Sequence, residues 1–262
     1  MRRMLKNLFL LILLIPLFVA SCSSLEPEIK LHYLGHSCVF LDFDGKVSVL
    51  CDYGMKNAYL EWGWDSPIYD AGEPGPDIIT YSHAHDDHFD LERAEKYEAL
   101  RFSEMTDTTI KNLSIKTFES SENDISTYDN LSFLFTYKNL RVLHLGDCQA
   151  DIMMINDPAV AWNIEQRYPK GCDIVIMPIE GTRQYILQAV KMIELLEPNV
   201  LIPTHYWSQS YKQEFLNEIE RQFNEKEKAI QVIGVSTSSY TYHKTGSDTG
   251  LLIPNLIQSE RK

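Results

Sequence analysis

The residues with the clearest chemical potential form one dense cluster, His83-Ala84-His85-Asp86-Asp87-His88. The cluster follows residues 77–82, an apolar run typical of a buried strand. In extended backbone, side chains alternate, so His83 and His85 would point to the same side. Imidazole and carboxylate ligands suit Zn(II), Fe(II) or Mn(II), whereas a structural zinc site would favour cysteine. Such a dense set predicts a site for two metals, an arrangement that activates water for hydrolysis.

The rest of the chain predicts the elements that must position this cluster. Strands are expected within residues 29–52 with a turn at Asp44-Gly45, and at 77–82, 108–118, 131–146, 173–179, 199–202 and 230–235. Helices are expected at residues 90–100, 185–196 and 211–223, with an aromatic-rich loop at 53–76 and an irregular segment at 148–170. Strands first, then strands alternating with helices, favour an α/β fold with two sheets between helical layers.

The spacing His-x-His-x-Asp-His resembles the signature of the metallo-β-lactamase superfamily. Further blocks match in the same order, at residues 33–37, 47–52, 143–147 and 203–206. The resemblance runs from about Lys30 to about Val235. Within the superfamily, it is strongest to the branch of ascorbate-phosphate-lactonase-like hydrolases and N-acylphosphatidylethanolamine phospholipase D. It implies the αβ/βα sandwich of that superfamily, with the site at the sheet edge where loops meet.

The resemblance also implies a ligand set for two divalent transition metals, with zinc expected first and iron or manganese as alternatives. Its members are His83 and His85 for the first metal, Asp87, His88 and His205 for the second, and Asp147 bridging both. Asp87 would also orient the nucleophile, a metal-bound hydroxide that attacks a carbonyl or phosphorus centre.

The third protein ligand of the first metal is left open. The family places a histidine near residues 116–121, and here Glu119 stands at the matching position. Glutamate can ligate all three metals, and a harder oxygen ligand would shift preference towards iron or manganese. His144 is the rival, although strand alternation would point it away from Asp147. An incomplete first site is the remaining alternative.

Two residues are candidates for supporting the ligands. Asp52 matches a family aspartate that orients metal-binding histidines, but it could equally cap a turn. His36 would lie near the metals or be a satisfied core histidine, and His144, if it is not a ligand, would join these supporting residues.

Candidate substrate contacts lie in the aromatic loop and beyond it. Trp62, Trp64, Met153, Met154 and Trp162 would line an apolar groove or form a satellite core. Arg183 would hold a substrate anion, or else pair with a surface carboxylate.

The N-terminus has the anatomy of an export signal. Arg2, Arg3 and Lys6 precede an apolar stretch that is short for a membrane span, and residues 19–22 resemble a bacterial lipoprotein box. We therefore expect a signal peptide at 1–21, lipidation of Cys22, a tether at 22–28 and one hydrolase domain at 29–262. The expected location is the bacterial envelope, at the outer membrane, through the acyl anchor. An ordinary signal peptide is the alternative.

The net charge restricts the possible binding partners, and the cysteines are expected to be structural. The net charge of −13 would become more negative after removal of the basic signal, which argues against nucleic acid. Cys38, Cys51, Cys148 and Cys172 are expected to be buried free thiols, although an exported protein could oxidise a pair.

The sequence thus predicts an exported, lipid-anchored, metal-dependent hydrolase. Its substrate would be a small or lipid-like molecule, either a cyclic ester such as a lactone or a phosphodiester. The alternative is a catalytically weak metal-binding or interaction lipoprotein that retains the fold. Nothing in the sequence indicates the oligomeric state.

Overall fold

The computed structural model describes residues 26–179, 182–225, 231–235, 239–244, 250–254 and 260–261. The expected signal peptide, Cys22 and most of the tether lie outside these residues. Within the described ranges, no helix is both long enough and apolar enough to span a membrane.

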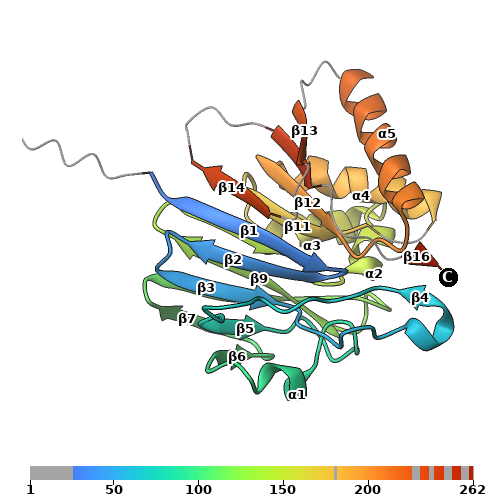
Figure 1. Cartoon of the computed structure of the whole chain (residues 1–262). Helices are drawn as coiled ribbons and strands as arrows, with labels where there is room; N and C mark the ends of the chain where they lie inside the picture. The colour runs from blue at the N-terminus through green and yellow to red at the C-terminus, as the bar shows by residue number, and fades with distance from the viewer. Residues whose placement is uncertain are drawn as a thin grey trace, which may run out of the picture.

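Two six-stranded sheets form the centre of the fold (Figure 1). The first contains β1 (Glu28–Gly35), β2 (Cys38–Phe43), β3 (Val47–Cys51), β5 (Ile78–Thr80), β6 (Leu100–Phe102) and β14 (Ser239–His243), in the order β14-β1-β2-β3-β5-β6. The second contains β7 (Asp107–Ile110), β8 (Leu113–Ser120), β9 (Asn130–Tyr137), β10 (Leu140–His144), β11 (Ile174–Pro178) and β12 (Val200–Thr204), in the order β12-β11-β10-β9-β8-β7. Short pairs join β4 (Trp64–Asp65) to β16 (Glu260–Arg261), and β13 (Gln231–Val235) to β15 (Gly250–Pro254).

Each sheet combines hairpins with parallel crossovers. The β2–β3 hairpin turns at Asp44-Gly45, where both residues have positive φ (56° and 62°), as a type I′ turn requires. The predicted strand at 108–118 is in fact a second tight hairpin, β7–β8, that turns at Lys111-Asn112. The pairs β3–β5, β10–β11 and β11–β12 are parallel, so the carboxyl ends of these strands meet at one edge of their sheets.

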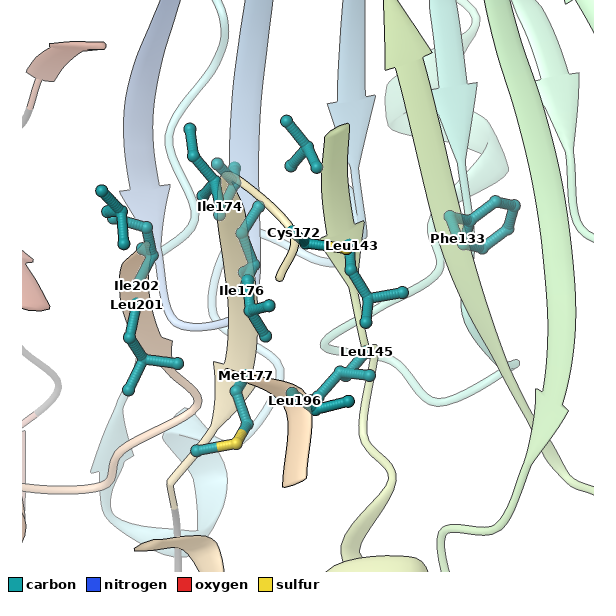
Figure 2. Close-up of a cluster of buried hydrophobic side chains, with 14 of the residues drawn as sticks. Phe133, Leu143, Leu145, Cys172, Ile174, Ile176, Met177, Leu196, Leu201 and Ile202 are labelled. Carbon is teal, nitrogen blue, oxygen red and sulfur yellow. The ribbon is translucent and has the colours of Figure 1, made fainter. Parts of the chain in front are cut away.

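The inner faces of the two sheets and helix α4 (Arg183–Leu196) share one hydrophobic core. β11 is buried along its whole length, as expected for a central parallel strand covered on both faces. Figure 2 shows the core around β11, to which Leu143, Leu145, Met177 and Leu196 contribute. The four described cysteines are buried free thiols, as predicted.

The other helices are η1 (Leu60–Trp62), α1 (Leu91–Ala94), α2 (Gln149–Met153), α3 (Pro158–Arg167) and α5 (Gln209–Glu225). In Figure 1, α4 and α5 lie on the side of the second sheet that holds β11 and β12. This arrangement confirms the two-sheet α/β sandwich predicted from the sequence.

Two predictions of local structure were wrong. The helix expected at 90–100 is only the single turn α1, because Tyr97 turns inward to pack under Gly75 and the chain continues as edge strand β6. The segment at 148–170 is not irregular, since it holds α2 and α3. Asp157 begins α3 by accepting a hydrogen bond from Ala159 N at 2.8 Å, with Pro158 in the first turn.

Candidate metal centre

The candidate ligands gather because each follows the carboxyl end of a strand. His36 follows β1, Asp52 follows β3, the cluster 83–88 follows β5, Glu122 follows β8, Asp147 follows β10 and His205 follows β12. His36, Asp52 and His205 all have left-handed φ values (45°, 50° and 57°), which are uncommon for residues other than glycine. The fold holds these residues in costly backbone conformations at one edge, as functional sites often do.

The first ligand group consists of His83, His85 and Glu122, with ligand atoms within 4.8 Å of one another. Glu122 Oε1 lies 2.9 Å from His85 Nδ1, and Glu122 Oε2 lies 3.4 Å from His83 Nε2. The Nδ1 atom of His83 is occupied by Ser82 Oγ at 3.0 Å, which leaves Nε2 to face the carboxylate. Two imidazole nitrogens and one carboxylate therefore converge on one point.

Neither sequence candidate for the third ligand reaches this point. Glu119 is exposed on β8, paired across the hairpin with Leu131, and it belongs to none of the ligand groups. His144 is buried on β10, and its Nε2 lies 3.7 Å from Asp52 Oδ2. Glu122 replaces both because β8 ends at Ser120, so the chain is free to turn the later side chain towards the histidines. Glu119 therefore belongs to no ligand group, and Glu122 takes its place as the candidate third ligand.

The second ligand group consists of His36, Asp87 and His205, and Asp87 contacts both histidines. Its Oδ2 atom lies 2.9 Å from His36 Nε2, 3.0 Å from His205 Nε2 and 3.3 Å from His88 Nε2. The Tyr59 hydroxyl donates to its other oxygen, Oδ1, at 2.7 Å. His36 thus lies at the site and is not a remote core histidine.

Asp147 connects the two groups. It forms a third set with His83 and His88, and its Oδ2 lies 3.5 Å from His205 Nε2. Gly146, at φ 62°, makes this approach possible, since a Cβ there would lie 2.5 Å from both Ser82 Cβ and Asn130 Oδ1. The position fits the bridging role that the resemblance implies.

Asp52 fixes the orientation of His88. Its Oδ2 accepts hydrogen bonds from His88 Nδ1 at 2.8 Å and from Ser82 Oγ at 2.9 Å, and its Oδ1 accepts one from the Ser82 backbone N at 2.8 Å. With Nδ1 bound to Asp52, Nε2 is the ring nitrogen that faces Asp87 and Asp147 and that a metal would use. Asp52 therefore lies where the orienting role requires.

Burial and crowded charge shift the pKa values of these groups. Burial and neighbouring Asp147 raise the pKa of Glu122 to about 8. Burial alone would lower the pKa of His88, but the carboxylates of Asp87 and Asp52 outweigh it and raise the pKa to about 10. Burial and His88 lower the pKa of His83 to about 2. Large pKa shifts in opposite directions among neighbouring groups are typical of functional sites.

The donor set fits bound metals. Among the described residues, the buried atoms His83 Nε2 and His88 Nε2 form no hydrogen bond, although both face carboxylates. Buried imidazole nitrogens rarely stay unpaired, so a cation at these positions would satisfy them. Nitrogen and carboxylate donors suit zinc, iron or manganese.

An aromatic wall, defined as Tyr59, Trp62, Trp64 and Trp207, borders the second group. Trp207 lies 4.6 Å from the His36 ring and 5.1 Å from the Trp64 ring, measured between centroids. Trp62 is 70 % exposed and stacks on Tyr59 at 5.3 Å. Gly54 allows the loop to approach, because a Cβ there would lie 2.2 Å from the Asp87 backbone. The expectation that Trp62 and Trp64 lie near the site agrees with this placement.

Other predicted contacts lie elsewhere. Arg183, at the start of α4, pairs with Glu214 and Glu218 of α5 at 3.0 and 3.4 Å, in line with the surface ion-pair alternative. Trp162 is 60 % exposed on α3 and lines none of the described cavities, whereas Met153 and Met154 line a cavity beside Glu122. A second cavity of about 510 Å³ lies over β1–β3 and includes none of the candidate ligands.

Sequence reasoning missed Glu122, Tyr59 and Trp207. Trp207 could have been suspected, since it follows His205 by two residues and stands directly after the matching block at residues 203–206. Glu122 and Tyr59 stand in irregular segments without periodicity, so only the three-dimensional structure reveals their contacts.

The sequence matches the family described as "Beta-lactamase superfamily domain" over residues 30–205. The structure is similar to an inferred Zn-dependent hydrolase of the metallo-β-lactamase superfamily from Thermotoga maritima, at 20 % identity and TM-score 0.56, covering 86 % of this chain and 98 % of the other. It is also similar to the metallo hydrolase Igni18 from Ignicoccus hospitalis, at 19 % identity and TM-score 0.53, covering 83 % and 100 %. A third similar structure is an inferred metal-dependent hydrolase from Parabacteroides distasonis, at 18 % identity and TM-score 0.56, covering 88 % and 94 %. A search of curated proteins gave no match. With a family match over more than half of its length, this chain belongs to the β-lactamase superfamily and adopts the metallo-β-lactamase fold.

Proposed function

We propose that this protein is a metal-dependent hydrolase with a dinuclear centre. The observation that carries the proposal is the convergence of three histidine–carboxylate groups, two of which share His83, at the carboxyl ends of strands from both sheets. His83, His85 and Glu122 would hold the first metal, and Asp87, His88 and His205 the second. Asp147 contacts both groups and would bridge them.

Two such metals, when bound, make hydroxide available near neutral pH and neutralise the oxyanion that develops during attack. The chain's own residues prepare the site for this chemistry. Asp52 holds His88 in the tautomer that presents Nε2. Tyr59 occupies Asp87 Oδ1 and His36 approaches Oδ2, so the orientation of this carboxylate is fixed from two sides.

The placement of Glu122 bears on the alternative of a catalytically weak binding lipoprotein. That alternative depended on a missing third ligand for the first metal. Glu122 lies 2.9 Å from His85 and belongs to the first group, so it is a candidate for that third ligand. The hydrolase is therefore the better-supported function.

The substrate and the location extend the proposal. A lactone or another cyclic ester, or a phosphodiester, would present a carbonyl or phosphorus centre to the metals. The acidic composition and the lipoprotein-like N-terminus support a small or lipid-like substrate at a bacterial outer membrane, with Cys22 carrying the acyl chains. The same charge argues against nucleic acid as a partner.

The test combines elemental analysis with a substrate panel. Protein purified with abundant Zn, Mn or Fe should hold close to two metal ions, and it should hydrolyse at least one of a lactone, an acyclic ester and a phosphodiester. His88→Ala should lower both metal content and activity. His243→Ala is the matched control, because His243 is an exposed β14 residue away from the ligand groups. Metal-free protein after metal-replete purification, or activity unaffected by chelation, would refute the proposal.

A further inference from the structure

A cavity of about 460 Å³, which we call the α2 pocket, lies between the loop after β8 and helix α2. The loop contributes Glu122, Asp124 and Ile125 to its lining, and the helix contributes Gln149 and Met153, followed by Met154. Glu122 also belongs to the first ligand group. Gln149 Nε2 donates to Asp147 Oδ2 at 3.0 Å. The α2 pocket therefore adjoins the metal centre, on the side of the first ligand group.

Three apolar side chains face this pocket without being buried in the core. Ile125 is 37 % exposed, Met154 is 44 % exposed and Met153 is half-buried. Unbranched methionine side chains adapt to ligands of varied shape, and they are common on surfaces that bind flexible apolar groups. Exposed apolar side chains beside a reactive centre are best explained by a hydrocarbon group that covers them.

The charge of the lining restricts the occupant further. Asp124 in the lining is acidic, and Asp129 lies close behind the pocket, accepting a hydrogen bond from Glu122 N at 2.8 Å. Among the described residues that line the pocket, none is lysine or arginine. A carboxylate or phosphate placed here would meet like charge and no partner, which is unfavourable in a partly desolvated cavity.

We propose that the α2 pocket binds an uncharged alkyl or acyl arm of the substrate while the reacting group lies at the metals. The inference rests on the proposed hydrolase function and narrows its substrate class. It favours esters and lactones with a hydrocarbon chain over compounds whose chain carries a negative charge.

The test uses lactones that carry ethyl, butyl, hexyl or octyl chains, with a matched octyl lactone whose chain ends in a carboxylate. Each methylene buried in the pocket should raise kcat/KM by roughly fourfold until the cavity is full. The terminal carboxylate should cancel most of the gain. Binding of the corresponding lactams, in which an amide replaces the ester, is measured in parallel by calorimetry and does not require hydrolysis.

A pocket variant shows where the chain binds. Met154→Glu places a carboxylate among the apolar side chains and should lower kcat/KM for the octyl lactone at least about tenfold, with little change for the ethyl lactone. Trp162→Glu is the matched control, because Trp162 is also an exposed apolar residue but lies outside the pocket. It should leave the dependence on chain length unchanged.

The outcomes separate this inference from the proposed function. Hydrolysis with no dependence on chain length, or a dependence that survives Met154→Glu, would overturn the α2 pocket while leaving the hydrolase intact. Lactam binding that strengthens with chain length, without hydrolysis of any lactone, would support the pocket and count against lactone hydrolysis. Absence of both lactone hydrolysis and lactam binding would overturn the α2 pocket, while the metal analysis and the wider substrate panel decide the proposed function.

Discussion

The substitution Glu122→Gln tests the reassigned ligand most directly. Gln keeps the shape of the side chain but removes the charge that makes Glu122 a ligand, and His83 and His85 remain in place. Loss of a partner that only orients a ligand costs about 10–100-fold in metal affinity, so loss of the ligand itself should cost at least about 100-fold. Glu119→Gln is the control, because Glu119 is an exposed carboxylate three residues earlier and belongs to no ligand group.

The pH dependence sharpens this prediction. Burial and Asp147 raise the pKa of Glu122 to about 8, so at pH 7 roughly nine-tenths of the metal-free protein carries a proton on this carboxylate. Metal binding must displace that proton, so wild-type affinity for the first metal should rise roughly tenfold from pH 6 to pH 7 and level off above pH 8. The part of this pH dependence that comes from Glu122 should be absent in Glu122→Gln. The difference in metal affinity between wild type and variant should therefore widen as pH rises.

Whereas metal affinity should rise with pH, the stability of the metal-free wild type should fall as pH rises. The folded-state pKa of Glu122 lies above the ordinary value of 4.5, so its stabilising contribution is present below pH 4.5 and is lost as pH rises towards 8. Metal-free Glu122→Gln should therefore match wild type at pH 5 and exceed it in melting temperature at pH 8. Metal titration against a competing chelator and thermal unfolding provide the two measurements. Unchanged metal affinity in Glu122→Gln, together with loss in Glu119→Gln, would show that the reassignment is wrong.

Three further predictions concern Asp52, His36 and Cys22. Asp52→Asn should lower metal affinity about 10–100-fold by releasing His88. Burial opposes ionisation of Asp52, but His88 and His144 lower its pKa to about 2, so acid unfolding of the metal-free wild type should show a loss of stability between pH 4 and 2 that Asp52→Asn lacks. His36→Gln retains a donor towards Asp87 and should cost roughly tenfold in affinity with two metals still bound; loss of one metal equivalent would instead make His36 a ligand. Cys22→Ser should abolish incorporation of labelled palmitate, and equal labelling of both proteins would exclude this lipidation site.

The ligands that belong to compact, ordered patterns can be identified from the amino-acid sequence alone. The cluster 83–88 follows a short apolar strand, and its own spacing indicates a metal site. Asp147 and His205 each follow another strand, and they are expected as ligands because their blocks resemble those of the superfamily. The same periodicity predicts the two-sheet sandwich and helices α4 and α5, because alternation and helical spacing are properties of local segments. Buried cysteines can likewise be expected from their apolar neighbours.

The third ligand of the first metal, in contrast, depends on how the whole chain folds. Glu119 and Glu122 are both carboxylates near the end of one strand, and their sequence positions do not reveal which one turns inward. In the fold, Glu119 still belongs to β8 and points to solvent, whereas Glu122 lies beyond the last paired residue and reaches His85. Helices α1 and α2 were misjudged for a similar reason, since each is a single short turn whose extent depends on packing partners distant in sequence. The longer helix α3 was missed although Asp157-Pro158 is a local start signal. Short irregular segments have no period of their own, so long-range contacts determine where their side chains point.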